Sequence, residues 1–162
     1  LPPSRAVTVA LAPFTRDDPR RMYPLARWSA LADLLTSEGK RVIVAGSREE
    51  AHMYRGFLDA LAAKGVIDEV GKHSLLDTAR MFMQCDAVIA NDSGLMHLSA
   101  ALGVPTVALF GATRKEKAGP LGQHTCVVES PYPCPPCDAK KDCGKPLSLY
   151  LEPRRQPQAQ TR

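Results

Sequence analysis

Short apolar runs alternate with segments of helical periodicity along most of this chain. The runs are rich in Val, Ile, Leu and Ala and end at proline, glycine or charged residues, which is typical of strands buried on both faces. We expect strands at residues 7–12, 41–45, 66–70, 86–90, 105–110 and 125–129. Between them, apolar residues recur at helical spacing and predict helices at 24–38, 49–63, 75–85 and 95–102.

Several residues mark the ends of these helices. Pro24 suits the first helical position. A backbone N–H at this position makes no hydrogen bond within the helix, so proline loses nothing by lacking one. Gly39 is expected to end the same helix. Ser74 is a typical N-cap residue, and Asp77 three positions later is expected to complete a capping box.

Strand and helix alternate strictly, which requires parallel strands joined by right-handed crossovers. The predicted fold class is α/β, a Rossmann-like doubly wound sheet of about six parallel strands in the order 3-2-1-4-5-6. Prolines crowd the sequence after residue 130, where we expect the compact part to end. We expect residues 1–6 to form a linker, 7–150 one domain with a cysteine-rich loop at 126–143, and 151–162 a disordered tail.

The composition of the chain excludes several classes of protein. The 162 residues, of which 44% are hydrophobic, are enough for one compact core. No apolar window approaches the roughly 20 residues that span a bilayer, and no basic-then-apolar leader opens the chain, so we expect a soluble intracellular domain. A net charge of +4 and an aromatic content of 6% argue against nucleic acid as a partner.

Ligands of open α/β sheets bind beyond the carboxyl ends of the strands, where the loops of this chain carry polar residues. The loop after the first expected strand holds Arg16, Arg20 and Arg21. These arginines could bind an anion, or the loop could be solvated and form surface ion pairs. Glu49 and Glu50 follow the second strand, where they could hydrogen-bond a ribose or simply favour the positive end of a helix dipole.

The segment after the fourth expected strand is the most informative. Residues 91–94 read Asn-Asp-Ser-Gly, and the backbone N–H groups from Ser93 onward could cradle a diphosphate that His97 also faces. The alternative is an ordinary helix cap by Asn91, Asp92 or Ser93 with a packed histidine behind it. The loop at 111–120, with Thr113 and three basic residues, could close over a phosphate or remain a solvated connection. Neither G-x-G-x-x-G nor a P-loop motif is present, which disfavours a nicotinamide cofactor.

The run from Asp92 to Gly103, followed by 105–111, resembles the signature of the family 9 glycosyltransferases, which include the ADP-heptose:lipopolysaccharide heptosyltransferases. The resemblance covers roughly residues 7–150 and extends to Trp28. Enzymes of that family have the GT-B fold, in which two Rossmann-like domains face each other across a cleft. The resemblance implies that this chain is the C-terminal, donor-binding domain, and that an N-terminal domain carries the acceptor site and the catalytic base.

The same resemblance implies a set of donor-binding residues. It assigns the diphosphate and the sugar of the donor to Asp92, Ser93, Gly94 and His97, with Thr15 as a further phosphate contact. Arg21 stands where the family commonly has a lysine, which keeps the charge and changes its geometry. Glu49 would take the ribose, and His73 would lie beside the adenine. No residue of this half is expected to be catalytic.

The implied reaction is the inverting transfer of a heptose or similar sugar from an ADP-sugar to a glycolipid or other glycan acceptor, in the biosynthesis of lipopolysaccharide or another glycoconjugate. That chemistry needs no metal ion, and the chain alone is expected to bind the donor without turning it over. The implied location is the cytoplasm, with at most peripheral association at the inner face of the inner membrane. Two alternatives stay open: a stand-alone, non-catalytic nucleotide-binding module, and a metal-binding assembly module of an autotransporter heptosyltransferase-like protein.

The last alternative depends on the cysteines. Cys134, Cys137 and Cys143 have the spacing C-x₂-C-x₅-C, which suits zinc or iron, and Cys126 or His124 could add a fourth ligand. The other interpretation is free thiols in a proline-braced loop. In the autotransporter heptosyltransferase branch, the resemblance implies iron at cysteines of this region.

Overall fold

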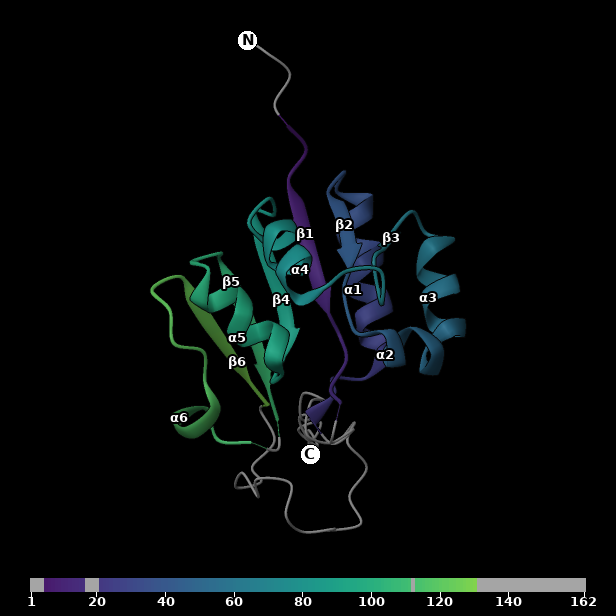
Figure 1. Cartoon of the computed structure of the whole chain (residues 1–162). Coiled ribbons are helices and arrows are strands. Elements are labelled where there is room, and N and C mark those ends of the chain that lie inside the picture. Colours follow the sequence, from purple (N-terminus) through teal and green to yellow (C-terminus); the bar gives the residue numbers. More distant parts are fainter. Residues whose placement is uncertain (1–4, 17–20, 112, 131–162) are drawn as a thin grey trace, which may run out of the picture.

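The computed structural model describes residues 5–16, 21–111 and 113–130. Its centre is a sheet of six parallel strands in the order β3-β2-β1-β4-β5-β6, which confirms the expected class and strand order. The strands point toward the lower end of Figure 1. They are β1 (Thr8–Ala12), β2 (Arg41–Val44), β3 (Ile67–Asp68), β4 (Ala87–Asn91), β5 (Thr106–Phe110) and β6 (Thr125–Glu129).

Helices lie on both faces of this sheet (Figure 1). They are α1 (Leu25–Ser37), α2 (Arg48–Met53), α3 (Arg55–Ala62), α4 (Leu75–Phe82), α5 (Gly94–Ala101) and α6 (Lys115–Ala118). The buried side chains of α1 and α3 pack on one face, and those of α4 and α5 pack on the other. This is the doubly wound arrangement that the alternation of elements predicts.

The central strand β1 is buried along its whole length and contributes to two cores. Because successive strand residues point to opposite faces, Ala10 packs in the cluster of Phe82 from α4, and Leu11 packs in the cluster of Trp28 from α1. Phe82 and Trp28 are both 0% exposed. Burying a large apolar side chain stabilises a fold by about 1.5–3 kcal/mol. The loop that follows β1 therefore starts from a firmly held position.

The single helix expected at 49–63 is interrupted at Tyr54 and forms two helices, α2 and α3. This residue has φ −112° and ψ 25°, and its ring stacks on that of Phe14 with the centroids 4.6 Å apart. Gly56, a weak helix former, follows two positions later. The aromatic contact joins residues far apart in the sequence, so helical periodicity could not reveal the break.

The capping box expected at Ser74 is only half present. Ser74 Oγ accepts a hydrogen bond from the Asp77 backbone N–H at 3.1 Å, but the Asp77 carboxylate accepts from that hydroxyl at 2.6 Å. Aspartate is shorter than the glutamate that usually completes the motif, so it stays with the hydroxyl. A complete box forms at α2, where Glu50 Oε2 accepts from the Ser47 N–H at 2.6 Å and Ser47 Oγ accepts from the Glu50 N–H at 3.3 Å.

Other element boundaries also differ from expectation. The strand expected at 66–70 is only Ile67–Asp68, because the Asp68 carboxylate accepts from the Val70 N–H at 3.0 Å and turns the chain. Pro24 is the N-cap of α1 and not its first residue. The loop expected at 111–120 contains the short helix α6.

Candidate functional site

The loops that follow β1, β2 and β4 meet at the carboxyl edge of the sheet, in the lower part of Figure 1. They surround a cavity of about 730 Å³, which we call the large cavity. Its walls include residues of these loops and of α2, α4 and α5, among them Phe14, Gly46, Glu50, His73, Leu75 and His97. This edge is where open α/β sheets bind their ligands, and the size suits a nucleotide.

A smaller hollow of about 190 Å³ adjoins the large cavity. The two spaces share Arg16, Ser93, Gly94 and His97 in their walls, so they form one continuous cleft. The small hollow brings together most of the residues predicted to bind the donor, namely Thr15, Arg21, Asp92, Ser93, Gly94 and His97. These residues come from the loop after β1 and from the segment after β4, which includes the first turn of α5.

Asp92 is the buried charge of the small hollow. It is 3% exposed, and its Oδ2 atom lies 3.6 Å from the Arg21 guanidinium. The same oxygen accepts a 2.7 Å hydrogen bond from Thr113 Oγ1, in the loop after β5. A buried carboxylate needs such partners, since leaving it unpaired costs several kcal/mol. Arg21 lines the hollow and carries five N–H donors, so its guanidinium can hold Asp92 and still offer donors to a ligand.

Asn91, the last residue of β4, ties the two functional loops together. Its side chain is fully buried, donates to the Pro13 carbonyl at 2.6 Å and accepts from the Tyr23 N–H at 3.0 Å. The sequence suggested Asn91 only as one candidate for a helix cap. Its amide instead fixes Pro13 and Tyr23, at the two ends of the loop after β1, against the end of β4 that precedes Asp92. A polar side chain at the end of an otherwise apolar strand is the sequence signal that could have revealed this role.

The start of α5 offers backbone N–H groups to the cleft. Ser93 is the N-cap residue, yet its side chain makes no capping hydrogen bond, and within the described part of the chain its buried Oγ has no partner. Gly94 is exposed, and a Cβ built on it would meet no atom within 4 Å. Packing within the protein therefore does not require glycine here, whereas a ligand lying against the backbone would. Amides at a helix N-terminus suit an anionic group.

Of the two glutamates after β2, Glu50 lines the large cavity. The Glu49 side chain is 76% exposed and lies 3.9 Å from the equally exposed Arg16 guanidinium. Such a surface pair contributes little to stability. The structure thus does not bring Glu49 together with the other predicted donor-binding residues. The Glu50 carboxylate does reach the cavity, where it also completes the capping box with Ser47.

One wall residue of the large cavity, Phe14, belongs to an aromatic stack. Phe14 lines the cavity, and its ring lies nearly parallel to that of Tyr54, at an interplanar angle of 9°. The Tyr54 hydroxyl donates to Met22 Sδ at 3.4 Å. Burial, and secondly the nearby Glu50 carboxylate, raise the pKa of Tyr54 above its usual value, so its hydroxyl stays protonated. The stack gives the cavity an apolar surface of fixed orientation.

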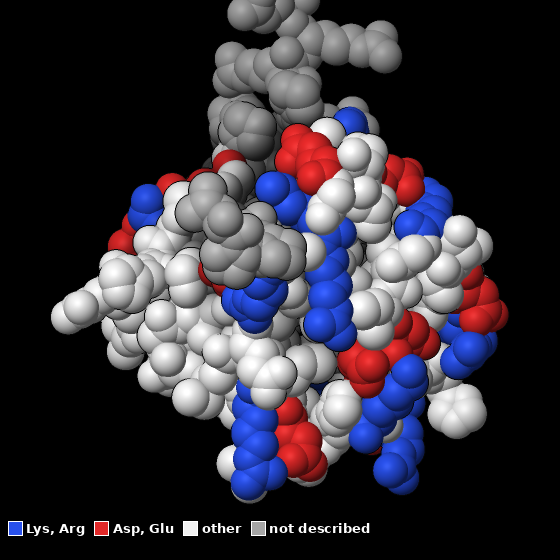
Figure 2. Space-filling model, turned by 90° about the horizontal axis from the view of Figure 1, so that it is seen from above, with Lys and Arg blue, Asp and Glu red and all other residues white. Residues whose placement is uncertain are grey.

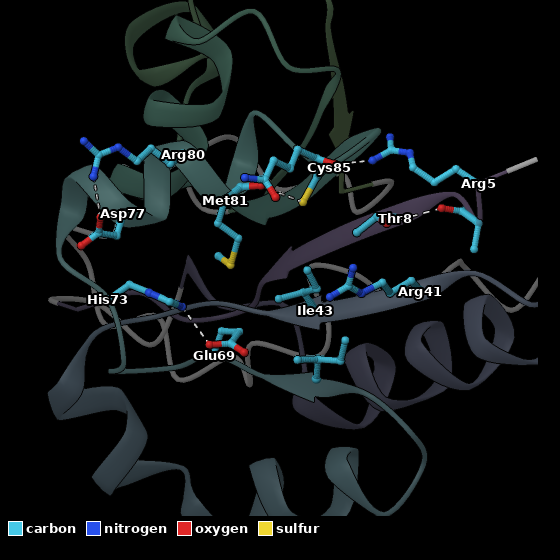
Figure 3. A pocket seen from close by; sticks show the side chains of 13 residues that line it. Arg5, Thr8, Arg41, Ile43, Glu69, His73, Asp77, Arg80, Met81 and Cys85 are labelled. Carbon is cyan, nitrogen blue, oxygen red and sulfur yellow. Dashed lines mark hydrogen bonds and ion pairs between the residues drawn. The ribbon is translucent and has the colours of Figure 1, made fainter.

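His73 lies between the large cavity and a separate groove of about 540 Å³. Its Nε2 atom is 2.8 Å from Glu69 Oε2. Figure 3 shows this pair on one side of the groove and Cys85 and Arg5 at the far end. Burial raises the pKa of the Cys85 thiol, which therefore stays protonated at neutral pH. The groove runs away from the cleft, so His73 is the point where the two spaces meet.

The end of the molecule opposite the cleft carries mixed charges. Figure 2 looks onto this end, where basic side chains lie next to acidic ones on the right and lower parts of the view, whereas the left part is mostly uncharged. One such pair joins the starts of β1 and β4, where Arg5 lies 2.8 Å from Asp86. Asp86 also accepts from the Thr8 N–H at 2.7 Å, and this hydrogen bond, followed by the charge of Arg5, lowers the pKa of Asp86.

The proposed cysteine ligands Cys134, Cys137 and Cys143 lie outside the described residues, as does the tail expected at 151–162. Cys126, on β6, is exposed. Within residues 5–16, 21–111 and 113–130, no three His, Cys, Asp or Glu side chains are grouped so as to hold a metal ion. In the same described part, none of the helices has the length and apolar character of a membrane span.

Comparison with known proteins gives a consistent picture. The family model of glycosyltransferase family 9 (heptosyltransferase) matches residues 4–147. Lipopolysaccharide heptosyltransferase 1 of Pseudomonas aeruginosa is 35% identical over 125 residues, which are 75% of this chain and 33% of that protein. Lipooligosaccharide heptosyltransferase 2 of Haemophilus influenzae is 28% identical over 74% of this chain and 36% of its own length. The chain thus spans about a third of the length of these curated relatives.

Solved structures agree with the sequence matches. The structure of E. coli ADP-heptose lps heptosyltransferase II is similar with a TM-score of 0.71 and 28% identity, over 78% of this chain and 39% of that one. E. coli heptosyltransferase WaaC with ADP is similar with a TM-score of 0.65 and 30% identity, over 81% of this chain and 40% of that one.

Proposed function

Since this chain belongs to glycosyltransferase family 9, we propose that it is the donor-binding half of an inverting heptosyltransferase that uses an ADP-sugar in the biosynthesis of lipopolysaccharide or another glycoconjugate. The observation that carries the proposal is the pairing of buried Asp92 with Arg21 beside the open backbone at Gly94. A sugar diphosphate needs cations and N–H donors for its phosphates and acceptors for its sugar hydroxyls. The small hollow offers all three kinds of group.

The diphosphate would lie against the start of α5. There the backbone N–H groups that follow Ser93 and the positive end of the helix dipole would meet it, with Arg21 and His97 at its sides and Thr15 as a further contact. Asp92 cannot itself bind a phosphate, because two negative charges at contact repel each other. Its carboxylate would instead accept hydrogen bonds from the sugar and hold Arg21 toward the phosphates.

The nucleoside would occupy the large cavity. Its apolar wall around Phe14 suits a base, with His73 and Leu75 nearby. Glu50 inside the cavity and Glu49 beside Arg16 are the two candidates for the ribose hydroxyls. Similarity to the E. coli heptosyltransferase that was solved with ADP supports adenine as the base.

In the proposed reaction, negative charge grows on the diphosphate as the sugar leaves. The α5 amides, Arg21 and His97 would stabilise this charge, because they are held in place before the bond breaks. These protein groups would serve without a divalent ion. The acceptor site and the catalytic base would belong to an N-terminal domain, in the part of the relatives that this chain does not cover. The chain alone would therefore bind the donor without completing transfer, and the whole protein would act in the cytoplasm, on a glycolipid at the inner face of the inner membrane.

Isothermal titration calorimetry with ADP, UDP and GDP tests the donor site. We expect saturable binding that is selective for ADP, weakened in Asp92→Asn and unchanged in Asp33→Asn, which alters an exposed carboxylate on α1. A preference for UDP or GDP would contradict the ADP-sugar assignment. Equal affinities for the two aspartate variants would contradict the site, and no binding of any nucleotide by the wild-type chain would contradict a donor site formed by this chain alone.

A further inference from the structure

We propose that Thr113 is a positioning residue of the donor site: its hydroxyl fixes the Asp92 carboxylate and, through it, the Arg21 guanidinium that receives the diphosphate. This inference rests on the proposed function. Thr113 follows β5, whereas Asp92 follows β4 and Arg21 follows β1. Three loops that are distant in the sequence are thus linked through one carboxylate.

The contacts show why the orientation of Asp92 depends on Thr113. Both Thr113 Oγ1, at 2.7 Å, and the Arg21 guanidinium, at 3.6 Å, approach the same oxygen, Oδ2. The distance to Thr113 is that of a strong hydrogen bond, whereas the distance to Arg21 is longer than a hydrogen bond. The threonine hydroxyl is therefore the closer of the two partners and sets the rotation of the carboxylate. Because the two oxygens belong to one rigid carboxylate, this contact also fixes the position of Oδ1.

Loss of the Thr113 hydroxyl would change how Arg21 is used. The Asp92 side chain is 4% exposed, so water cannot readily replace a missing donor. Among the described residues, the Arg21 guanidinium is the cation paired with Asp92, and it would move from 3.6 Å into direct contact. Arginine and aspartate form bidentate pairs that occupy two N–H groups of the fork. Fewer donors would then face the small hollow, and affinity for an anion would fall although no residue touching that anion had changed.

Thr113→Val keeps the shape of the side chain and removes only the hydroxyl. We expect it to weaken ADP binding about tenfold, as the loss of one charge-assisted hydrogen bond does. Thr113→Ser restores the hydroxyl and is expected to bind ADP within about twofold of wild type. Thr125→Val makes the same chemical change on β6, where the hydroxyl donates to the Gly122 carbonyl, and is the matched control. Calorimetry measures the affinities, and thermal unfolding shows that each variant is folded.

A double-mutant cycle separates positioning from direct contact. If Thr113 acts through Asp92 and Arg21, Thr113→Val costs no further ADP affinity in an Arg21→Ala background. An undiminished loss in that background would overturn the inference, because it would mean that Thr113 meets the ligand itself. Wild-type affinity of Thr113→Val would overturn it as well and leave the proposed function standing. If the wild-type chain binds no ADP, the proposed function fails first. Should the valine variant not fold, Thr113→Ala replaces it in the same cycle.

Discussion

The side-chain oxygen of Asn91 accepts a 3.0 Å hydrogen bond from the backbone N–H of Tyr23. Through this bond, β4, which ends just before Asp92, holds the segment that begins at Arg21, two residues before Tyr23. The Asn91 amide nitrogen holds the other end of the same loop through the Pro13 carbonyl. The distance between Arg21 and Asp92 is thus constrained by a buried amide that is not among the residues lining the small hollow.

Asn91→Ala is expected to destabilise the fold and to weaken nucleotide binding. It leaves the Pro13 carbonyl and the Tyr23 N–H without their partner, and each unsatisfied buried group costs about 1–3 kcal/mol. We expect a loss of about 2–4 kcal/mol in the free energy of unfolding, measured by urea denaturation. Gln84→Ala, an exposed amide after α4, is the control and should change stability little. Equal stability of the two variants would contradict the role given to Asn91.

Arg21→Ala is expected to weaken ADP binding roughly tenfold to hundredfold, because a charge-assisted hydrogen bond to phosphate contributes about 1.5–3 kcal/mol. Lysine at this position keeps the charge and should retain part of the affinity. Arg27→Ala removes an exposed arginine of α1 and should leave affinity unchanged. Calorimetric titrations at low and high salt would compare the variants. An equal effect of Arg21→Ala and Arg27→Ala would mean that only net charge matters.

Gly94→Ala separates folding from binding. The added Cβ meets no protein atom within 4 Å, so the melting temperature should stay the same or rise. A ligand lying against this backbone would be displaced, and we expect ADP affinity to fall about tenfold or more, which corresponds to about 1.4 kcal/mol. Gly56→Ala on α3 also adds a Cβ into open space and should leave affinity unchanged. Wild-type affinity of Gly94→Ala would show that the ligand does not approach this glycine.

Acid should weaken the fold through Asp86. The hydrogen bond from Thr8 and the charge of Arg5 lower the pKa of Asp86 in the folded chain below that of an unfolded aspartate, about 3.9. A depressed pKa stabilises the fold above the unfolded pKa, and this stabilisation is lost as the pH falls through the folded pKa. The melting temperature of the wild type should therefore be higher than that of Asp86→Asn at neutral pH, and the difference should shrink in strong acid. Asp59→Asn, on the surface of α3, is the control. A difference that is the same at all pH values would refute the assignment.

Much of this fold follows from local pattern. The residues of β1 are apolar on both faces of the strand, which indicates a sheet covered by helices on both sides. Together with the alternation of strands and helices along the chain, this predicts the parallel sheet, its strand order and the position of the cleft. The break at Tyr54 could not, because it depends on stacking with Phe14, 40 positions earlier by sequence number. The periodicity of apolar residues indicates which face of a helix is buried. It does not indicate which aromatic ring from another part of the chain packs against that face.

The candidate site shows the same division. Asp92, Ser93, Gly94 and His97 are close in the sequence, and the structure places them in one hollow. The contact between Thr113 and Asp92 joins two loops, so it depends on the pairing of β4 with β5. Glu49 and Glu50 are neighbours with the same chemistry, and only the course of α2 decides which of them lines the large cavity.

Backbone amide chemical shifts of the ¹⁵N-labelled chain, recorded during titration with ADP, test the location of the donor site most directly. The account predicts that the largest shifts fall on two groups of residues, at the start of α5 around Ser93 and Gly94 and in the loop after β2 around Gly46 and Ser47. Residues around Arg5 and Arg41, in the groove on the other side of His73, should shift little. Shifts concentrated in that groove, with none at Gly94, would contradict the central claim that the carboxyl edge of this sheet binds the donor.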